Sequence, residues 1–351
     1  MGPKGYTKGD TLARLMKNFG WSKDEAFVFG DGGNDISMFK QTNYSFAMGQ
    51  ALESVKNEAK YITLSNDEDG IYEALMKFKM ENKILELYAN RIRKHILTEV
   101  YSAKSGHPGG SLSAADILTE LYFEQMDINK DNVNTIDRDR FVLSKGHASP
   151  VLYATLAEKG FVDIEDLKGF RHIDSKLQGH PNMNYVSGVD MSTGSLGQGI
   201  SCAVGMAITN KVDGNDHRVY ALLGDGECEE GEVWEAAMAA SHYKLDNLCA
   251  ILDYNHLQID GNIEDVISPE PFKSKFEAFG WRVIEANGHD FNSLRTAFNF
   301  AKQTVDKPTI IIAHTIKGKG VSFMENNYAW HGAAPNQEQY EQAMKELGGL
   351  E

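Results

Sequence analysis

The chain contains 351 residues, of which 42% are hydrophobic and 24% are charged, with a formal net charge of −15 at pH 7. This composition is that of a globular protein and excludes a disordered chain or a fibrous repeat. The acidic balance argues against nucleic acid or an anionic membrane as a partner, because both attract basic surfaces. Neither a signal peptide in residues 1–10 nor a membrane-spanning run is recognisable, so we expect a cytoplasmic enzyme.

The first predicted elements form a small α/β piece. Short apolar runs at residues 26–29, 44–48 and 61–64 predict strands that are buried on both faces. The first run leads into the motif G-D-G-G-N-D at residues 30–35. Carboxylate and carboxamide oxygens at the carboxyl end of a strand suit Mg²⁺, so this motif indicates a metal site.

This piece resembles the C-terminal part of haloacid-dehalogenase-type phosphatases of the Cof-like group. The resemblance rests on the motif at residues 30–35, on Lys8 at the start of a predicted helix, and on the segment A-M-G-Q-A at residues 47–51. It implies a partial Rossmann-like fold over residues 1–79. The site residues that it implies are Lys8 for the phosphoryl group, Asp31 and Asp35 for magnesium, and Asn34 beside them.

The nucleophile of that family is an aspartate in a D-x-D-G motif, and no such motif precedes Lys8 in this sequence. Phosphoryl transfer through an aspartyl phosphate needs this attacking carboxylate. We therefore expect a vestigial site without phosphatase activity. The leading interpretation is a fragment left by a gene fusion, frameshift or truncation, and the alternative is a metal-binding or regulatory role.

An amphipathic run at residues 81–102 predicts a helix at the start of a second piece, which we expect to cover residues 80–351. No Pro/Gly/Ser-rich linker precedes it, which is compatible with one continuous helix across the boundary. Further buried strands are predicted at residues 140–144, 218–223, 248–253, 281–285 and 309–313. We therefore expect an α/β fold with a mainly parallel sheet flanked by helices.

Four histidines lie in glycine-flanked turns. They are His107 in S-G-H-P-G, His147 in S-K-G-H-A, His180 in G-H-P and His331 in W-H-G. The glycine-rich segment S-T-G-S-L-G-Q-G at residues 192–199 lies between the last two. Imidazoles on turns suit a site that binds hydroxylated, phosphorylated sugars and moves protons near neutral pH.

Two neighbouring strand ends carry the most specific motif. The strand at residues 218–223 ends in G-D-G, with Asp225 in the centre, and a helix is predicted to follow. The next strand leads to Asn255, 30 residues beyond Asp225. Glycines and a helix N-terminus favour a phosphate, and adjacent strand ends would bring the carboxylate and the carboxamide together on a hard cation. The pair predicts a magnesium diphosphate site.

Residues 81–351 resemble the N-terminal half of transketolase, which is its diphosphate-binding domain. The G-D-G…N pair is the signature of thiamine-diphosphate enzymes in general, and the histidine turns favour transketolase among them. The resemblance implies that Asp225, Asn255 and the carbonyl of Leu257 bind Mg²⁺, or Ca²⁺ or Mn²⁺ as substitutes. It implies the following contacts to thiamine diphosphate: His147, Gly194, Ser195, Leu196, Gly226, Asn255, Lys317 and His331.

The same resemblance assigns catalytic roles to His107, His180 and His331, which would face the sugar and move protons to and from its hydroxyls. Glu230 would join the carboxylates that link paired active sites. The implied reaction transfers a two-carbon ketol unit between sugar phosphates. Because the glutamate that activates thiamine comes from the following domain of transketolases, we expect a C-terminal partner subunit in an α2β2 assembly.

Three other functions stay open at this point. The G-D-G…N pair also fits deoxyxylulose-phosphate synthase and dehydrogenase-type thiamine enzymes. A cofactor-binding scaffold without activity is another class of protein with the same motifs. A sugar-phosphate phosphatase built on residues 1–79 is the least favoured, because the nucleophile motif is missing.

Overall fold

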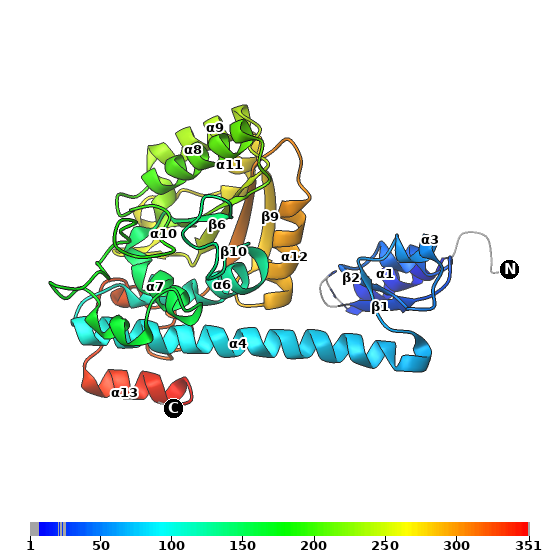
Figure 1. The fold of residues 1–351 in the computed structure, drawn as a ribbon, viewed down its shortest axis with the longest axis horizontal. Helices are drawn as coiled ribbons and strands as arrows, with labels where there is room; N and C mark the ends of the chain where they lie inside the picture. Colours follow the sequence, from blue (N-terminus) through cyan, green and yellow to red (C-terminus); the bar gives the residue numbers. More distant parts are fainter. Residues whose placement is uncertain (1–6, 20, 22, 24–25, 350–351) are drawn as a thin grey trace. The chain divides into compact units, whose positions relative to one another are not determined.

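The computed structural model describes residues 7–19, 21, 23 and 26–349 (Figure 1). The chain divides into two compact units, Met1–Ile84 and Leu85–Glu351. The expected boundary between residues 79 and 80 lies inside one helix, α4 (Gly70–Ala103), which runs without interruption through the division. The amphipathic run at residues 81–102 is therefore the later part of a longer helix.

The first unit is a small α/β fold around a three-stranded parallel sheet. Its elements are α1 (Lys8–Phe19), β1 (Phe27–Gly30), α2 (Ile36–Phe39), β2 (Tyr44–Ala47), α3 (Glu53–Lys56), β3 (Tyr61–Ile62) and η1 (Asn66–Glu68). The sheet has the order β1-β2-β3, so all three predicted strands are present, and the helix predicted at Lys8 is α1. Aromatic rings on neighbouring strands stack, with the Phe27 and Tyr44 centroids 4.6 Å apart, because paired residues in parallel strands lie on the same face.

The second unit is built on a five-stranded, all-parallel sheet. The strands are β4 (Arg140–Leu143), β5 (Val219–Gly224), β6 (Leu248–Tyr254), β9 (Arg282–Asn287) and β10 (Thr309–His314). They lie side by side in the order β4-β5-β6-β10-β9. Each strand matches a predicted one to within two residues at either end, so the expected mainly parallel sheet is confirmed.

Helices cover both faces of this sheet (Figure 1). Beside α4, the helices of this unit are α5 (Pro108–Ser113), α6 (Ala115–Glu120), α7 (Ser149–Glu158), α8 (Gln198–Asp213), α9 (Gly231–His242), α10 (Ile263–Val266), α11 (Phe272–Ala278), α12 (Phe291–Lys302) and α13 (Gln337–Glu346). Successive residues of a strand point to opposite faces. Val219 and Ala221 of β5 accordingly pack with α8, α9 and α11, whereas Tyr220 and Leu222 pack with α6, α7 and α12.

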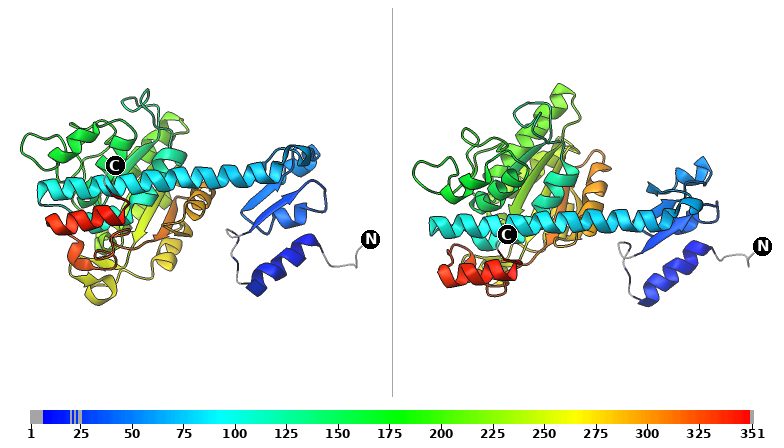
Figure 2. Two further views of the ribbon diagram at one scale, coloured as in Figure 1. Left: turned by 90° about the horizontal axis from the view of Figure 1, so that it is seen from below. Right: turned by 60° about the horizontal axis from the view of Figure 1, so that its bottom comes forward.

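The second half of α4 packs on the α6 and α7 side through Ile92, Ile96 and Leu97. Helix α13 lies beside this half of α4 (Figure 2), where the rings of Tyr101 and Tyr340 stack with centroids 4.2 Å apart. Helix α4 ends at Ala103 because the next residue, Lys104, adopts a left-handed conformation with φ 51°. No helix among the described residues is long and apolar enough to cross a membrane.

Several short elements occupy the loops around the sheet. The hairpin of β7 (Leu257–Gln258) and β8 (Gly261–Asn262) is antiparallel and was not predicted, since two-residue strands carry no hydrophobic period. It follows directly after β6 and places Leu257 beside the end of that strand. The remaining short helices are η2 (Leu121–Gln125), which is a π-helix, and the 3₁₀-helices η3 (Gly146–Ala148), η4 (Ile164–Gly169), η5 (Gly226–Glu229) and η6 (Tyr328–Trp330).

Candidate active site

The carboxyl ends of β5 and β6 bring Asp225 and Asn255 together. The two strands are neighbours, and Gly224 pairs in register with Asp253. The backbone N–H of Asn255 donates to Oδ2 of Asp225 at 2.9 Å, and the N–H of Gly226 donates to Oδ1 at 2.9 Å. Oδ2 also accepts the N–H of His256 at 2.6 Å. The expected juxtaposition of carboxylate and carboxamide is therefore present.

These strand ends line a cavity of about 250 Å³. Most of the residues implied by the family resemblance meet there, although they come from segments that are up to 184 positions apart (331 − 147). Gly110, Lys145, Glu227, Glu229 and Gln258 also line it. The predicted residues among its lining are His147, Leu196, Asp225, Gly226, Glu230, Asn255, Leu257, Lys317 and His331.

Asp225 carries a charge that the fold itself disfavours. Burial, and after it the nearby charge of Asp253, raise the pKa of Asp225 to about 6, while Lys317 acts in the opposite direction. Burial likewise lowers the pKa of Lys317 to about 8. A divalent cation would relieve this cost, because it stabilises the ionised carboxylate directly.

The donor set at the strand ends fits a divalent cation with a diphosphate. A carboxylate, a carboxamide oxygen and the Leu257 carbonyl are the hard oxygen ligands that Mg²⁺ prefers. Lys145 and Lys317, which are 1% and 2% exposed, bring two ammonium groups to the same cavity. Buried Nδ1 atoms of His107 and His331 have no hydrogen-bond partner among the described residues, which leaves polar capacity for a ligand.

A buried ion pair at the cavity, which Lys145 lines, was not predicted from the sequence. Lys145 pairs with Asp253, and its Nζ also donates to the carbonyl of Gly110 at 2.8 Å. Ser113 and Thr315 donate to the same carboxylate. Burial by itself raises the pKa of Asp253, but Lys145 and these donors lower it on balance. In the sequence, the only signals for this ion pair were the position of Asp253 at the end of a predicted strand and the position of Lys145 in the His147 turn.

Glu227 also lines the cavity and was not predicted from the sequence. Its carboxylate is 3% exposed and accepts the Ser144 hydroxyl at 2.5 Å and the backbone N–H groups of Gly197 and Gly224 at 3.0 Å each. It thereby ties the glycine-rich segment and the turn before His147 to the G-D-G turn. By contrast Glu230, the predicted link between active sites, is exposed at the start of α9.

Three of the four predicted histidines form one cluster. The ring centroids of His107, His147 and His331 lie 5.1 to 5.5 Å apart in pairs. Burial, with the positive charges of Arg171, His180 and Lys317 after it, lowers the pKa of His107 to about 4. Burial and the charge of Lys317 lower the pKa of His331 to about 3. These imidazoles are neutral at physiological pH and offer one donor and one acceptor each.

The depressed pKa of His331 predicts a pH-dependent stability. The unfolded chain binds a proton near pH 6.5, whereas folded His331 binds one only near pH 3, so stability falls as the pH falls between these values. We expect His331→Asn to reduce this loss by at most about 1.4 kcal/mol per pH unit. Denaturant unfolding without ligand at pH 4.5, 5.5 and 7 measures the slope, with His242→Asn as the control on an exposed histidine. An unchanged slope in His331→Asn would contradict the assignment.

Three further predicted residues lie beside the cavity without lining it. Gly194 contacts the His180 ring closely, since a Cβ at Gly194 would lie 3.0 Å from Cδ2 of that ring. With φ 154°, Gly194 also adopts a conformation that favours glycine. Ser195 and His180 are exposed near this turn. The glycine-rich segment therefore lies against both the His180 ring and Gly146 of the His147 turn.

The predicted vestigial site of the first unit is also assembled. Nζ of Lys8 lies 2.6 Å from Oδ1 of Asp35, and Oδ2 of Asp35 accepts the N–H groups of Asp31 and Gly32. The side chain of Gln50 donates to Asp31 at 3.1 Å. Asn34 is exposed beside them. Hydrogen bonds and the Lys8 charge outweigh burial and lower the pKa of Asp35.

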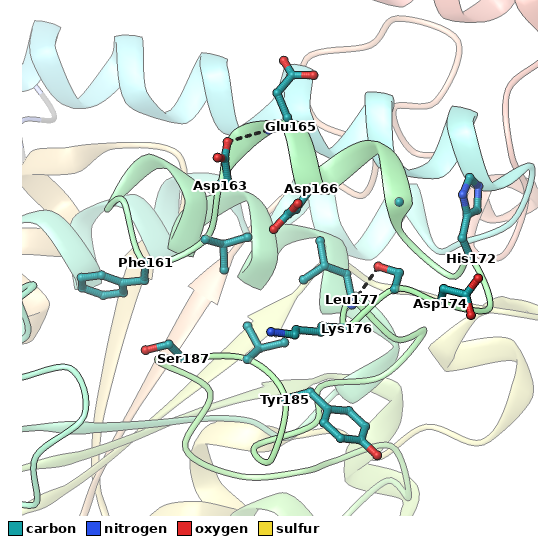
Figure 3. A pocket seen from close by; sticks show the side chains of 14 residues that line it. Phe161, Asp163, Glu165, Asp166, His172, Asp174, Lys176, Leu177, Tyr185 and Ser187 are labelled. Carbon is teal, nitrogen blue, oxygen red and sulfur yellow. Dashed lines mark hydrogen bonds between the residues drawn. The ribbon is translucent and has the colours of Figure 1, made fainter.

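A larger cavity, of about 720 Å³, lies between η4 and the loop that carries Tyr185 (Figure 3). Its lining includes the carboxylates of Asp163, Glu165, Asp166 and Asp174, and none of the predicted site residues. A separate group with metal-ligating atoms within 4.8 Å of one another comprises His256, Glu264 and Glu270, two of which are exposed. Neither place combines a strand-end glycine turn with buried cations, so we place the candidate site at the smaller cavity.

The fold and the donor set of this cavity fit the diphosphate-binding domain of a thiamine-diphosphate enzyme. A family model described as the transketolase thiamine diphosphate binding domain matches residues 84–350. The chain therefore belongs to the transketolase family, whose members are transferases. Residues 1–75 match a second model, described as haloacid dehalogenase-like hydrolase.

The relatives include subunits that this chain matches over almost their full length and a transketolase that it matches over less than half. The chain is 46% identical over 268 residues to an apulose-4-phosphate transketolase subunit of Phocaeicola vulgatus, covering 76% of this chain and 95% of that protein. It is 44% identical over 263 residues to the 6-deoxy-6-sulfo-D-fructose transketolase subunit SqwG of a Clostridium species, covering 75% and 96%. The crystal structure of transketolase from Campylobacter jejuni superposes with a TM-score of 0.72 at 39% identity, covering 76% of this chain but 43% of that one.

Proposed function

We propose that this chain is the N-terminal subunit of a two-subunit transketolase that binds magnesium thiamine diphosphate and transfers a two-carbon ketol unit between sugar phosphates. The observation that carries the proposal is the meeting of Asp225, Asn255 and Lys317 in one cavity. Relatives named as subunits, matched over 95% and 96% of their lengths, support a partner subunit for this chain. An α2β2 assembly is the arrangement that we propose.

The strand ends and the two buried lysines would hold the metal and the diphosphate. Asp225 and Asn255 present oxygens to the cation, and Lys145 and Lys317 supply positive charge to an anion in the cavity. When bound, thiamine diphosphate supplies the electron sink for carbon–carbon bond cleavage. Leu196 adds an apolar side chain to the lining.

His107, His180 and His331 would act on the sugar. A neutral imidazole can accept a proton from a sugar hydroxyl or donate a hydrogen bond to it, and the ring itself carries no net charge. The negative charge of a bound phosphate would raise the pKa of His107 and His331 from about 4 and about 3 toward the neutral range. We therefore expect these rings to transfer protons when the phosphate-bearing ligands are bound.

A coupled assay tests the proposal. The chain is mixed with thiamine diphosphate, Mg²⁺, xylulose 5-phosphate and ribose 5-phosphate, with and without a matching C-terminal transketolase subunit. We expect ketol transfer only when the C-terminal subunit is added, and its loss in Asp225→Ala. Apulose 4-phosphate and 6-deoxy-6-sulfo-D-fructose serve as further donors, because relatives are named for them.

Other outcomes identify other classes of protein. Product from pyruvate and glyceraldehyde 3-phosphate, without ketol transfer, would assign the chain to the deoxyxylulose-phosphate synthase class. Silence with every donor, in the presence of a C-terminal subunit that is shown to bind, would indicate a scaffold without activity. Either result would contradict the transketolase proposal.

A further inference from the structure

The ammonium group of Lys317 contacts the backbone carbonyl of Leu257, which is one of the proposed metal ligands. Nζ of Lys317 donates to the carbonyl oxygen of Leu257 at 2.8 Å, and the side chain is 2% exposed. Asp225, which is 3% exposed, lines the same cavity, and its negative charge favours the protonated form of Lys317. A single cationic side chain therefore contacts one of the three proposed metal ligands and is attracted by a second.

Of the two lysines that line the cavity, Lys317 is the one whose charge can balance that of Asp225. The other lysine of the cavity, Lys145, is engaged with Asp253 and with the Gly110 carbonyl. The three hydrogen bonds that Asp225 accepts all come from backbone N–H groups, which carry no net charge. Among the described residues that line the cavity, Lys317 thus supplies the charge that offsets Asp225.

Hydrogen bonds hold the backbone on both sides of Lys317. The N–H of Gly318 donates to the carbonyl of Gly109 at 3.0 Å. The N–H of Ile316 donates to Nε2 of His289 at 2.8 Å, and Nδ1 of that ring lies 2.6 Å from Oδ2 of Asp116. Because the loop is held on both sides of Lys317, a displacement of its ammonium would come from rotation about the side-chain bonds rather than from movement of the loop.

We propose that Lys317 is an internal counter-ion, a side chain that takes the place of the divalent cation at Leu257 and Asp225 and leaves it only when a diphosphate arrives. The proposal rests on the metal site of the proposed function. An ammonium and a divalent cation on the same carbonyl repel each other strongly at a buried site. A diphosphate attracts the ammonium away and adds its own oxygens, so metal and diphosphate bind together and the metal alone binds poorly.

A direct measurement of metal binding tests the proposal that Lys317 is an internal counter-ion. Mn²⁺ is titrated into the full chain without thiamine diphosphate, and free Mn²⁺ is followed by its electron paramagnetic resonance signal. We expect Lys317→Met to bind Mn²⁺ at least about tenfold more tightly than the wild type, because the competing charge is gone. Lys317→Arg keeps the charge and should bind as weakly as the wild type.

Lys319→Met is the matched control. Lys319 lies on the same loop, but its ammonium is 3.5 Å from Glu325 and does not line the cavity. Its replacement should leave Mn²⁺ affinity unchanged. The inference is overturned if Lys317→Met binds Mn²⁺ no more tightly than the wild type, or if Lys319→Met gains as much. Near-ultraviolet circular dichroism establishes folding, and Lys317→Gln replaces the methionine variant if that variant is unfolded.

Two further titrations separate this inference from the proposed function. Adding Asp225→Asn to Lys317→Met should abolish the gain, and a gain that persists would place the Mn²⁺ elsewhere and overturn the inference. Wild-type chain with thiamine diphosphate should take up Mn²⁺. If it does so while Lys317→Met shows no gain without diphosphate, the metal site stands and the counter-ion fails. If no variant takes up Mn²⁺ under either condition, both proposals fail.

Discussion

Replacing Asp225 with asparagine is expected to weaken the binding of magnesium thiamine diphosphate by more than about 100-fold, since even residues behind a metal ligand cost roughly 10- to 100-fold when mutated. The carboxamide keeps the size of the side chain but removes the charge that would hold the cation. Isothermal titration of thiamine diphosphate at saturating Mg²⁺ measures the loss. Asp216→Asn, which changes an exposed carboxylate in the same unit, is the matched control.

The same substitution is not expected to weaken the folded chain. Because the pKa of Asp225 is raised to about 6, its stabilising contribution falls as the pH rises from about 4 through 6 and its charge opposes folding at neutral pH. We therefore expect Asp225→Asn to unfold at the same or a higher temperature than the wild type at pH 7.5 without ligand. Lost binding together with a much lower unfolding temperature would show a structural defect and contradict the assignment as a metal ligand.

The largest loss of stability is expected from Asp190→Ala. Asp190 is 6% exposed and accepts two hydrogen bonds from Arg138, at 2.6 and 3.1 Å, and one from Arg140 at 2.8 Å. It also accepts the N–H of Phe141 at 2.9 Å, at the start of β4. Removal of the carboxylate leaves Arg138, which is 3% exposed, as a buried charge without its partner, and this costs about 3–5 kcal/mol.

Calorimetry of the full chain measures this effect as a fall in the unfolding temperature of the second unit on the order of 10 °C. Glu165→Ala is the control, because Glu165 pairs with Lys168 at 2.7 Å on the surface, where both side chains are more than 60% exposed. A surface pair contributes about 1 kcal/mol or less. Equal effects of the two substitutions would show that the buried cluster at Asp190 does not stabilise the sheet.

The sequence predicted the sheet well because buried parallel strands are apolar without interruption. The runs that became β5, β6 and β10 were recognised from their short length, their apolar content and the turn residues beside them, which favour a buried strand. The position of Asp225 and Asn255 followed as well, because parallel strands end at one edge of their sheet. The continuous helix across the boundary agrees with the missing linker in the sequence, whereas its start at Gly70 and the hairpin of β7 and β8 were not predicted.

By itself the sequence determined the fold class, the family resemblance and the strand ends where the cation would lie. Only the tertiary structure decided which polar residues serve that site. In the sequence, Lys145, Asp253 and Glu227 are indistinguishable from surface charges, because a residue type does not state its burial. The fold removes them from water and pairs each with specific donors or acceptors. The contact of Lys317 with Leu257 likewise depends on two loops 60 positions apart that meet only in the folded chain.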